Sequence, residues 1–287
     1  MYDMIIIGRG PAGISASLYT SRANLKTLII GKVSSLSKSH MVDNYYGFQH
    51  GIRGDELLNQ GEKQTVKFGT VMLEDEVIAL EYDFEGTYTV KTKDNSYNSK
   101  TVLLATGSEK KKISIQNLDK FEGKGIHYCT TCDGYFYKGK KVAVLGYNEY
   151  ALNEIHEMKQ FTQDITLLTN GRDVEINFEN TIINKKKIVS LEGHDYLENV
   201  IYDDGSEEKF DGIFVAYGVA SSVDFARKLG IIIKDNIIEV DQDQKTNLDS
   251  LYAAGDCCSK IKQVAVAVGQ GAIAGLKISE YIRNLGR

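Results

Sequence analysis

The sequence has no long apolar run, no excess of basic residues and few cysteines, and each shortage argues against a class of protein. No stretch approaches the ~18 consecutive apolar residues of a membrane-spanning helix. A net charge of −5 disfavours non-specific nucleic-acid binding, which needs a basic surface. The first residues, MYDMIIIGRG, enter an apolar run without the charged region and cleavage site of a secretion signal. We therefore expect a cytoplasmic protein with no membrane or nucleic-acid partner.

The four cysteines are too few for a disulfide-stapled protein, and their spacing points to chemistry. Cys129 and Cys132 form a C-x-x-C pair, which in a cytosolic chain indicates redox or metal chemistry. A structural zinc site normally needs four ligands, typically two such pairs. The other two, Cys257 and Cys258, are adjacent and poorly placed for one tetrahedral metal. We therefore favour a redox disulfide over a metal site. For Cys257 and Cys258 we favour small buried residues over a second redox role.

Two polar residues flank the dithiol. Asp133 follows Cys132 directly and is a candidate to donate or accept the proton that thiolate chemistry requires near neutral pH. His127 lies two residues before Cys129 and is either a group that tunes the dithiol or, as we favour, a structural histidine.

The N-terminal stretch YDMIIIGRGPAGISAS predicts a dinucleotide-binding loop between a strand and a helix. Gly8 permits a tight turn, Gly10 lets the backbone approach a pyrophosphate, and Gly13 allows close packing of helix on strand. The alternative is a purely structural tight turn. The acidic residue that usually binds the ribose is missing, because Gly31 and Lys32 stand where it is expected.

Two later strands also end in candidate ligand-binding residues. KTVLLATGS, residues 100–108, ends in Thr106 and Gly107, and SLYAAGDCC ends in Gly255 and Asp256. An acid at such a strand end can hydrogen-bond a sugar hydroxyl or a ribityl chain, although a plain turn with a helix cap is the alternative. If Asp256 and the N-terminal loop serve one ligand, their domain is discontinuous.

The length of 287 residues suits two domains. We predict a discontinuous domain of residues 1–114 and 242–287, with residues 115–241 inserted in it. The inserted part has its own strand–turn–helix in KKVAVLGYNEYALNEIHEM, a second strand in DITLLTNG, a hairpin around VIYDDGSEEKF and a strand in GIFVAYG. DNSYNSK, near residue 97, and the lysine run 185–187 indicate solvated turns.

Seven motifs occur in the order typical of one enzyme family: GRGPAG, VDNYYG, LLATGS, YCTTCDG, VAYG, AAGD and KQVAVAVGQG. On these residues the chain resembles the low-molecular-weight flavin-dependent thioredoxin reductases over nearly its whole length. The resemblance implies an α/β fold of two nucleotide-binding-type three-layer domains, the second inserted in the first, as in FAD/NAD(P)-linked reductases. It also implies a homodimer that binds FAD and reduces thioredoxin.

The resemblance further assigns roles to residues. Cys132 faces the flavin, Cys129 attacks the substrate disulfide and Asp133 handles the proton, with the inserted domain swinging between the two steps. The residues implied around FAD are Gly8, Gly10, Pro11, Ala12, Gly13, Gly31, Lys32, Asn44, Val77, Thr106, Gly107, Gly255, Asp256, Lys262, Gln263 and Val264.

The chain departs from this family where NADPH binds. The turn Gly146-Tyr147-Asn148-Glu149-Tyr150-Ala151 keeps one glycine and adds an acid and two rings where a pyrophosphate approaches. Beyond the next strand, Arg172 is the only nearby arginine, whereas the family uses two on the 2′-phosphate. The later turn 218–221 lacks the family's proline and asparagine. We therefore predict that NADPH does not bind.

Electrons must then come from another donor, and the nearest resemblance is to the ferredoxin-dependent flavin thioredoxin reductases. Acidic ferredoxin would favour a local basic surface, for which the candidates are Lys110, Lys111, Lys112, Lys138, Lys140, Lys141, Lys185, Lys186 and Lys187. Three alternatives stay open: an NAD(P)H-dependent reductase with an atypical site, a related flavin disulfide oxidoreductase with another donor such as a second flavoprotein or a quinone, and a flavin-binding sensor that does not turn over.

Overall fold

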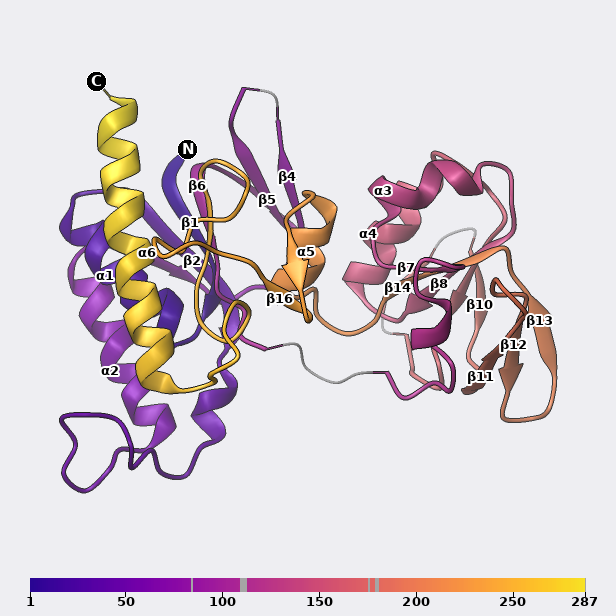
Figure 1. The fold of residues 1–287 in the computed structure, drawn as a ribbon, viewed down its shortest axis with the longest axis horizontal. Helices are drawn as coiled ribbons and strands as arrows, with labels where there is room; N and C mark the ends of the chain where they lie inside the picture. Colours follow the sequence, from indigo (N-terminus) through magenta and orange to yellow (C-terminus); the bar gives the residue numbers. More distant parts are fainter. Residues whose placement is uncertain (84, 109–112, 175, 179–180, 287) are drawn as a thin grey trace. The chain divides into compact units, whose positions relative to one another are not determined.

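The computed structural model describes residues 1–286 except residues 84, 109–112, 175 and 179–180. The chain divides into two compact units, the first comprising Met1–Lys110 and Ser221–Arg287 and the second Lys111–Ala220 (Figure 1). Both are α/β units built on parallel strands. Among the helices described, none combines the length and apolar character needed to cross a bilayer.

The first unit is a sheet with strand order β3-β2-β1-β6-β5-β4, in which β17 also pairs with β6, together with a small β15–β16 ladder. Its strands are β1 (Tyr2–Arg9), β2 (Thr27–Val33), β3 (Val71–Leu73), β4 (Val77–Tyr82), β5 (Tyr88–Thr92), β6 (Ser96–Leu104), β15 (Ile233–Lys234), β16 (Ile237–Ile238) and β17 (Leu251–Ala253). Its helices are α1 (Pro11–Arg22), α2 (Gly54–Lys67), α5 (Ser222–Lys228) and α6 (Val264–Leu285).

The apolar run MIIIG becomes the central strand β1, as predicted. Ile5 pairs in parallel with Leu28 of β2 on one side and with Val102 of β6 on the other. A strand flanked on both sides and covered on both faces is buried along its middle, which is why Met4–Ile7 are continuously apolar and not alternating. The glycine loop therefore follows the middle strand of the sheet and begins α1.

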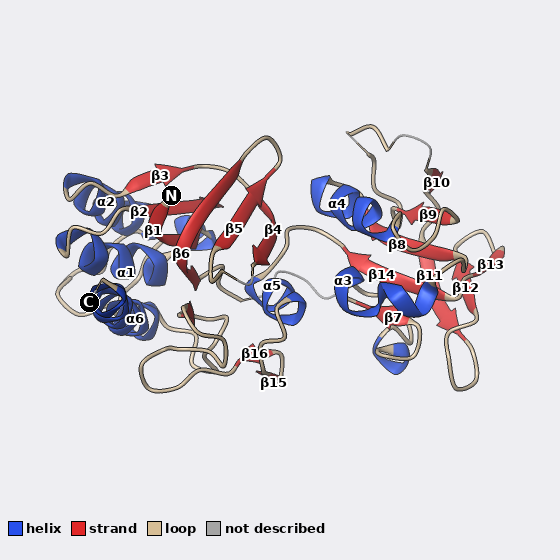
Figure 2. Cartoon of the chain, turned by 90° about the horizontal axis from the view of Figure 1, so that it is seen from above, coloured by secondary structure: helices blue, strands red, loops and turns tan. Residues whose placement is uncertain are grey.

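Helices α1 and α6 lie side by side in the first unit (Figures 1 and 2). A side chain at Gly271 would place its Cβ 2.1 Å from the Ala12 carbonyl oxygen, and one at Gly275 would lie 2.5 Å from that of Ala16. The small residues of α6 thus allow the two backbones to approach closely. The C-terminal helix is in this way packed on the helix that the N-terminal glycine loop begins.

The second unit combines a parallel sheet of order β10-β9-β8-β14-β7 with an antiparallel sheet of order β11-β12-β13. Its strands are β7 (Ile126–His127), β8 (Val142–Gly146), β9 (Ile165–Leu168), β10 (Ile182–Asn184), β11 (Ile188–Glu192), β12 (Asn199–Tyr202), β13 (Glu207–Lys209) and β14 (Gly212–Ala216). Its helices are α3 (Thr130–Asp133) and α4 (Glu149–Met158).

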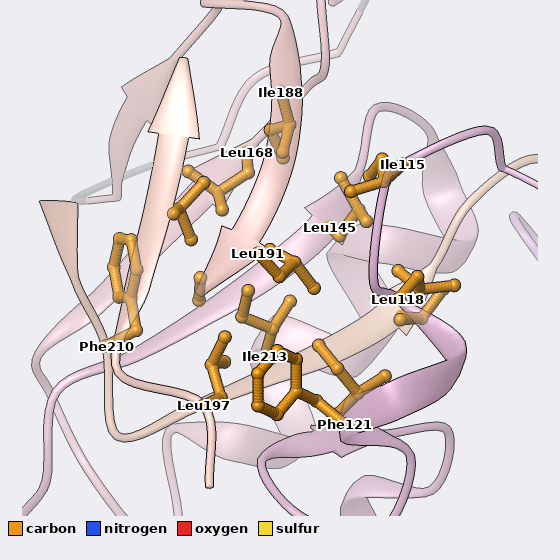
Figure 3. Packing of buried hydrophobic residues seen from close by; sticks show 14 of the residues in the cluster. Ile115, Leu118, Phe121, Leu145, Leu168, Ile188, Leu191, Leu197, Phe210 and Ile213 are labelled. Carbon is orange, nitrogen blue, oxygen red and sulfur yellow. The ribbon is translucent and has the colours of Figure 1, made fainter. Parts of the chain in front are cut away.

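The core of the second unit lies between its two sheets (Figure 3). Leu145 and Ile213 of the parallel strands belong to the same buried cluster as Leu191 of β11 and Phe210 after β13. Helix α4 packs on β8 and β14. The strands in VAVLG, ITLL and GIFVA and the β12–β13 hairpin are all as predicted.

Two predictions differ from the structure. Residues 221–241, which we placed in the inserted domain, belong to the first unit. The reason is that Ser222 at the start of α5 bonds Thr106, and Ile238 donates its backbone N–H to the Cys257 carbonyl. The polar stretch DNSYNSK is not all turn, because Ser96 begins β6 and pairs with Lys91 of β5.

Candidate functional site

The glycine loop after β1 is tight for two structural reasons. Gly8 has a φ of +124°, and a Cβ there would lie 2.2 Å from the Ala105 carbonyl oxygen. A Cβ at Gly13 would lie 2.3 Å from the Gly8 carbonyl oxygen. Both glycines are therefore required by the packing of strand, turn and helix, as their positions in the motif predicted.

Gly10 has no such structural requirement. Its φ is −93° and its ψ −178°, an extended backbone open to any residue, and a Cβ there would find only Ser34 Oγ at 3.6 Å. Gly10 also stands at the N-terminus of α1, where no side chain caps the helix. A glycine that neither backbone nor packing demands, at an uncapped helix start, is the arrangement that lets a phosphate approach. These residues fit the pyrophosphate of a dinucleotide.

At the end of β2, the two predicted cofactor residues Gly31 and Lys32 contact other parts of the protein. A Cβ at Gly31 would lie 3.1 Å from the Arg9 amide nitrogen, so this glycine packs against the loop. Lys32 forms an ion pair with Glu76. Both positions are accounted for by contacts within the chain.

The structure brings Gly255 and Asp256 to the glycine loop, as a discontinuous domain requires. Gly255 has a φ of +85°, and a Cβ there would lie 3.1 Å from the Ala12 Cβ. Burial raises the pKa of the Asp256 carboxyl, an effect that Lys262 opposes. In the part of the chain that the structure describes, this carboxylate accepts no hydrogen bond. A half-buried acid beside the loop fits a hydroxyl donor from a ligand.

The remaining predicted cofactor residues fall into separate groups. Asn44 donates from Nδ2 to Gln263 Oε1 at 2.8 Å, directly before Val264 begins α6. Thr106 Oγ1 lies 2.8 Å from Ser222 Oγ and accepts from the Ser222 N–H at 2.8 Å, a contact that we did not predict. Gly107 follows with a φ of +80°. Val77 is buried at the start of β4, where it pairs with Thr92, so the sheet explains its burial.

The second unit carries the dithiol as a disulfide between Cys129 and Cys132. Cys129 caps α3, and its Sγ accepts the Cys132 N–H at 3.1 Å. Thr130 donates to Glu154 at 2.7 Å and Thr131 to Glu157 at 3.1 Å, so both intervening residues bind α4. Cys129 is only 4 % exposed, whereas Cys132 is exposed. The more accessible sulfur is that of Cys132.

His127 connects the dithiol helix to a buried tyrosine. Its Nδ1 lies 2.9 Å from Asp133 Oδ2 and its Nε2 lies 2.6 Å from the Tyr137 hydroxyl. Sequence reasoning treated this histidine as structural. The signal for it was the presence of a carboxylate and a phenol within ten residues of the ring.

In the turn between β8 and α4, side chains of the second unit occupy the groups that would face a nucleotide. Asn148 accepts the Ala151 N–H through Oδ1 at 3.4 Å, which caps α4, and donates from Nδ2 to the Gly218 carbonyl at 2.6 Å. The turn also places two rings together, since the centroids of Tyr147 and Tyr217 are 5.1 Å apart. Arg172 lies over the Tyr147 ring and donates from Nε to the Tyr217 hydroxyl at 3.3 Å. The one arginine near the turn is thus engaged with the rings.

The remaining predicted residues are the cysteines outside the C-x-x-C pair and the candidate lysines for ferredoxin. Cys257 is buried, as expected, and Cys258 is partly buried; neither is in a disulfide. Lys110, Lys111 and Lys112 lie outside the described residues. Of the other candidate lysines, those with an ion-pair partner are Lys141 with Glu208, Lys185 with Asp173 and Lys186 with Asp204.

Comparison with known proteins gives one consistent answer. The model of the pyridine nucleotide-disulphide oxidoreductase family matches residues 2–271. The thioredoxin reductase of Bacillus subtilis (strain 168) is 30 % identical over 305 residues, covering 99 % of this chain and 96 % of that protein. The fold class predicted from sequence, that of a FAD/NAD(P)-linked reductase, is confirmed.

Two solved structures extend the match. The atypical thioredoxin reductase TRi from Desulfovibrio vulgaris Hildenborough is 37 % identical, with a TM-score of 0.95 and 99 % of each chain covered. A ferredoxin-flavin thioredoxin reductase from Clostridium acetobutylicum is 30 % identical, with a TM-score of 0.72 and coverage of 99 % of this chain and 98 % of that one. With a family model and relatives that span almost its whole length, this protein belongs to the pyridine nucleotide-disulphide oxidoreductase family.

Proposed function

We propose that this protein is a FAD-dependent thioredoxin reductase whose flavin is reduced by ferredoxin and not by NADPH. The relatives named thioredoxin reductase and the C-x-x-C disulfide support the reaction. The ferredoxin-flavin enzyme among the similar structures supports the donor. The observation that carries the donor assignment is the occupied turn after β8. The direct test is to mix anaerobic, oxidised, FAD-loaded protein with each donor and follow flavin colour.

Three features at and beside the occupied turn oppose a pyridine nucleotide. A pyrophosphate binds the free N–H groups at a helix start, but Asn148 already accepts one of them at the start of α4. Glu149 adds a negative charge in the first turn of the same helix, which repels phosphate. Arg172, the one arginine available for a 2′-phosphate, is held by Tyr147 and Tyr217.

The first unit supplies the flavin site in this proposal. Gly10 and the start of α1 would hold the pyrophosphate, Asp256 the ribityl side, and Asn44 with Gln263 the approach to the ring. Once bound, FAD would supply the electron pair needed to open the disulfide. Cys132, the accessible sulfur, is assigned to the flavin side and Cys129 to the attack on thioredoxin. Homodimer formation and a cytoplasmic location stay predictions.

Replacing Gly10 is expected to remove flavin without unfolding the protein. Gly10→Val adds a branched side chain whose Cβ would meet Ser34 Oγ at 3.6 Å as its nearest atom outside the neighbouring residues, so we expect the fold to accept it while the pyrophosphate is blocked. We expect FAD affinity to fall at least ~10-fold, about 1.4 kcal/mol. The measurement is the flavin-to-protein ratio after dialysis, with the melting temperature of the apoprotein as control. Gly10→Ala should lie between wild type and Gly10→Val, and full flavin content in Gly10→Val would contradict the assignment.

A further inference from the structure

One hydrogen-bonded network joins His127, Asp133 and Tyr137 and ends at the dithiol helix. The ring of His127 spans the other two, with 2.9 Å from Nδ1 to Asp133 Oδ2 and 2.6 Å from Nε2 to the Tyr137 hydroxyl. Asp133 is the last residue of α3, and its backbone N–H donates to the Cys129 carbonyl at 3.1 Å. The carboxylate and the two sulfurs are therefore parts of one helical turn.

Packing holds the histidine in this position. The His127 ring stacks on Phe214 of β14 with centroids 5.3 Å apart, and the Tyr137 ring meets both edge-on. Gly212 makes room for the tyrosine, since a Cβ there would lie 2.4 Å from Tyr137 Cε1. The side chain of His127 is 11 % exposed and that of Asp133 is 35 % exposed. The network thus extends from the buried phenol of Tyr137 to the partly exposed carboxylate of Asp133.

The hydrogen-bond directions follow from chemistry. Burial raises the pKa of Tyr137, with Asp133 and Asp211 adding to the effect, so the phenol keeps its proton and donates it to Nε2. Nδ1 then carries the ring hydrogen and donates to Asp133. When one further proton enters, it resides either on the carboxylate or on the ring, and a hydrogen bond between Asp133 and His127 is kept in both cases.

Dithiol chemistry needs such a proton store. Each substrate disulfide that is reduced takes up two protons, and the thiols Cys129 and Cys132 give up two. A lone carboxyl group has a pKa of ~4 and is almost fully ionised at pH 7, so alone it holds no proton to deliver there. The hydrogen bond between His127 Nδ1 and Asp133 gives such a proton a second position, on the neighbouring ring.

We propose that His127 is a positioning residue that shares one proton with Asp133, and that this pair, steadied by Tyr137, carries protons between the dithiol and the leaving thiols of the substrate. The proposal rests on the proposed function, and it concerns this chain's own dithiol and not the flavin. His127 thereby takes part in proton transfer, whereas the sequence had favoured a purely structural role for it.

In the first step, the pair takes the proton of the Cys129 thiol, and the thiolate attacks one substrate sulfur, forming a mixed disulfide and breaking the substrate S–S bond. The leaving thiolate takes the proton from the pair. The pair then takes the proton of Cys132, whose thiolate attacks Cys129 Sγ, and the second leaving thiolate is protonated in turn. Two electrons and two protons pass to the substrate, and the pair ends as it began.

Four other charged groups lie near this hydrogen-bonded network within the described residues. Asp211 acts on Tyr137, and the ammonium of Lys140 lies 5.3 Å from the centroid of the Tyr137 ring. Glu154 and Glu157 of α4 accept hydrogen bonds from Thr130 and Thr131 of the dithiol helix. None of these groups is hydrogen-bonded to the His127 nitrogens, which are occupied by Asp133 and Tyr137. Replacing His127 should therefore act on this network directly.

The test compares two disulfides with different leaving groups. The full-length protein is reduced with dithiothreitol, freed of reductant, and mixed anaerobically with 2-hydroxyethyl disulfide or with 5,5′-dithiobis(2-nitrobenzoate). An alkyl thiolate needs a proton to leave well, whereas the acidic aromatic thiolate does not. We expect His127→Phe, which keeps a ring to stack on Phe214, to react ~10-fold or more slowly with the alkyl disulfide at pH 7 and recover toward acid pH. Its rate with the aromatic disulfide should fall less, because the Cys129 proton must still be removed but the leaving thiolate needs no proton.

Two further variants sharpen the result. His127→Gln keeps a donor and an acceptor but cannot titrate, so it should be as slow as His127→Phe. His194→Phe is the matched control, because His194 pairs with Asp195 at 3.2 Å on an exposed surface and should react like wild type. Equal slowing with both disulfides, no slowing, or full rescue by glutamine would each overturn the proposal. Wild-type protein that reduces both small disulfides but not thioredoxin would refute the proposed function and leave this inference standing.

Discussion

Reduced ferredoxin is expected to bleach the flavin of this protein under anaerobic conditions, whereas NADPH and NADH are expected to leave it oxidised. The physical reason is that the turn after β8 is filled by its own groups: Asn148 caps α4 and bonds the Gly218 carbonyl. The rings of Tyr147 and Tyr217 hold Arg172. The measurement is the loss of visible flavin absorbance on rapid mixing. We expect the rate with ferredoxin to exceed that with NADPH by at least ~10²-fold, the loss typical of removing bidentate phosphate contacts.

Dithionite is the control for this experiment, because it reduces an accessible flavin without any binding site. Bleaching by dithionite and by ferredoxin alone supports the proposed donor. Bleaching by dithionite alone would favour a different donor, such as a second flavoprotein. Prompt bleaching by micromolar NADPH would show that the turn after β8 does admit the nucleotide and would contradict the proposed donor.

Cys129→Ser and Cys132→Ser are each expected to abolish thioredoxin reduction while FAD stays bound. A serine hydroxyl can neither form the Cys129–Cys132 disulfide nor accept the electron pair in its place. The residues proposed for FAD belong to the first unit and both cysteines to the second, so flavin content should not change. We expect turnover to fall by at least ~10³-fold, as is usual when a covalent catalytic group is lost.

The assay is reduction of thioredoxin by ferredoxin-reduced protein, followed by the appearance of thioredoxin thiols. Cys258→Ser serves as the matched control, since it removes a partly buried thiol outside the C-x-x-C pair and should retain turnover. Full activity in either C-x-x-C variant would contradict the proposed route of electrons.

Features that depend on residues close together in the sequence were predicted well. The continuous apolar run in β1, the glycines 8 and 13 and the strand VAVLG each depend on neighbours within a few residues, so the pattern alone identifies them. The polar stretch DNSYNSK was misread because Ser96 lies in a strand through its pairing with Lys91, which composition does not reveal. Tertiary pairing overrode the local signal there.

The errors and omissions of larger consequence are non-local. The contact of Thr106 with Ser222 joins residues 116 positions apart and moves α5 into the first unit, and no periodicity encodes it. The hydrogen-bonded network around His127 was missed for a different reason. Its residues are near in sequence but follow an irregular path from a two-residue strand into a single helical turn. Asn148 was read only as a lost glycine, although its capping bond is what occupies the helix start.

The interlocked first unit also constrains biosynthesis. Strand β17 is held by β6, and Gly271 and Gly275 fit against Ala12 and Ala16. The nascent N-terminal loop therefore lacks its neighbours until β17 and α6 have left the ribosome, while residues 111–220 form an unbroken segment able to fold earlier. Cofactor loading should accordingly be post-translational, and ribosome-stalled chains that end before α6 should carry no flavin.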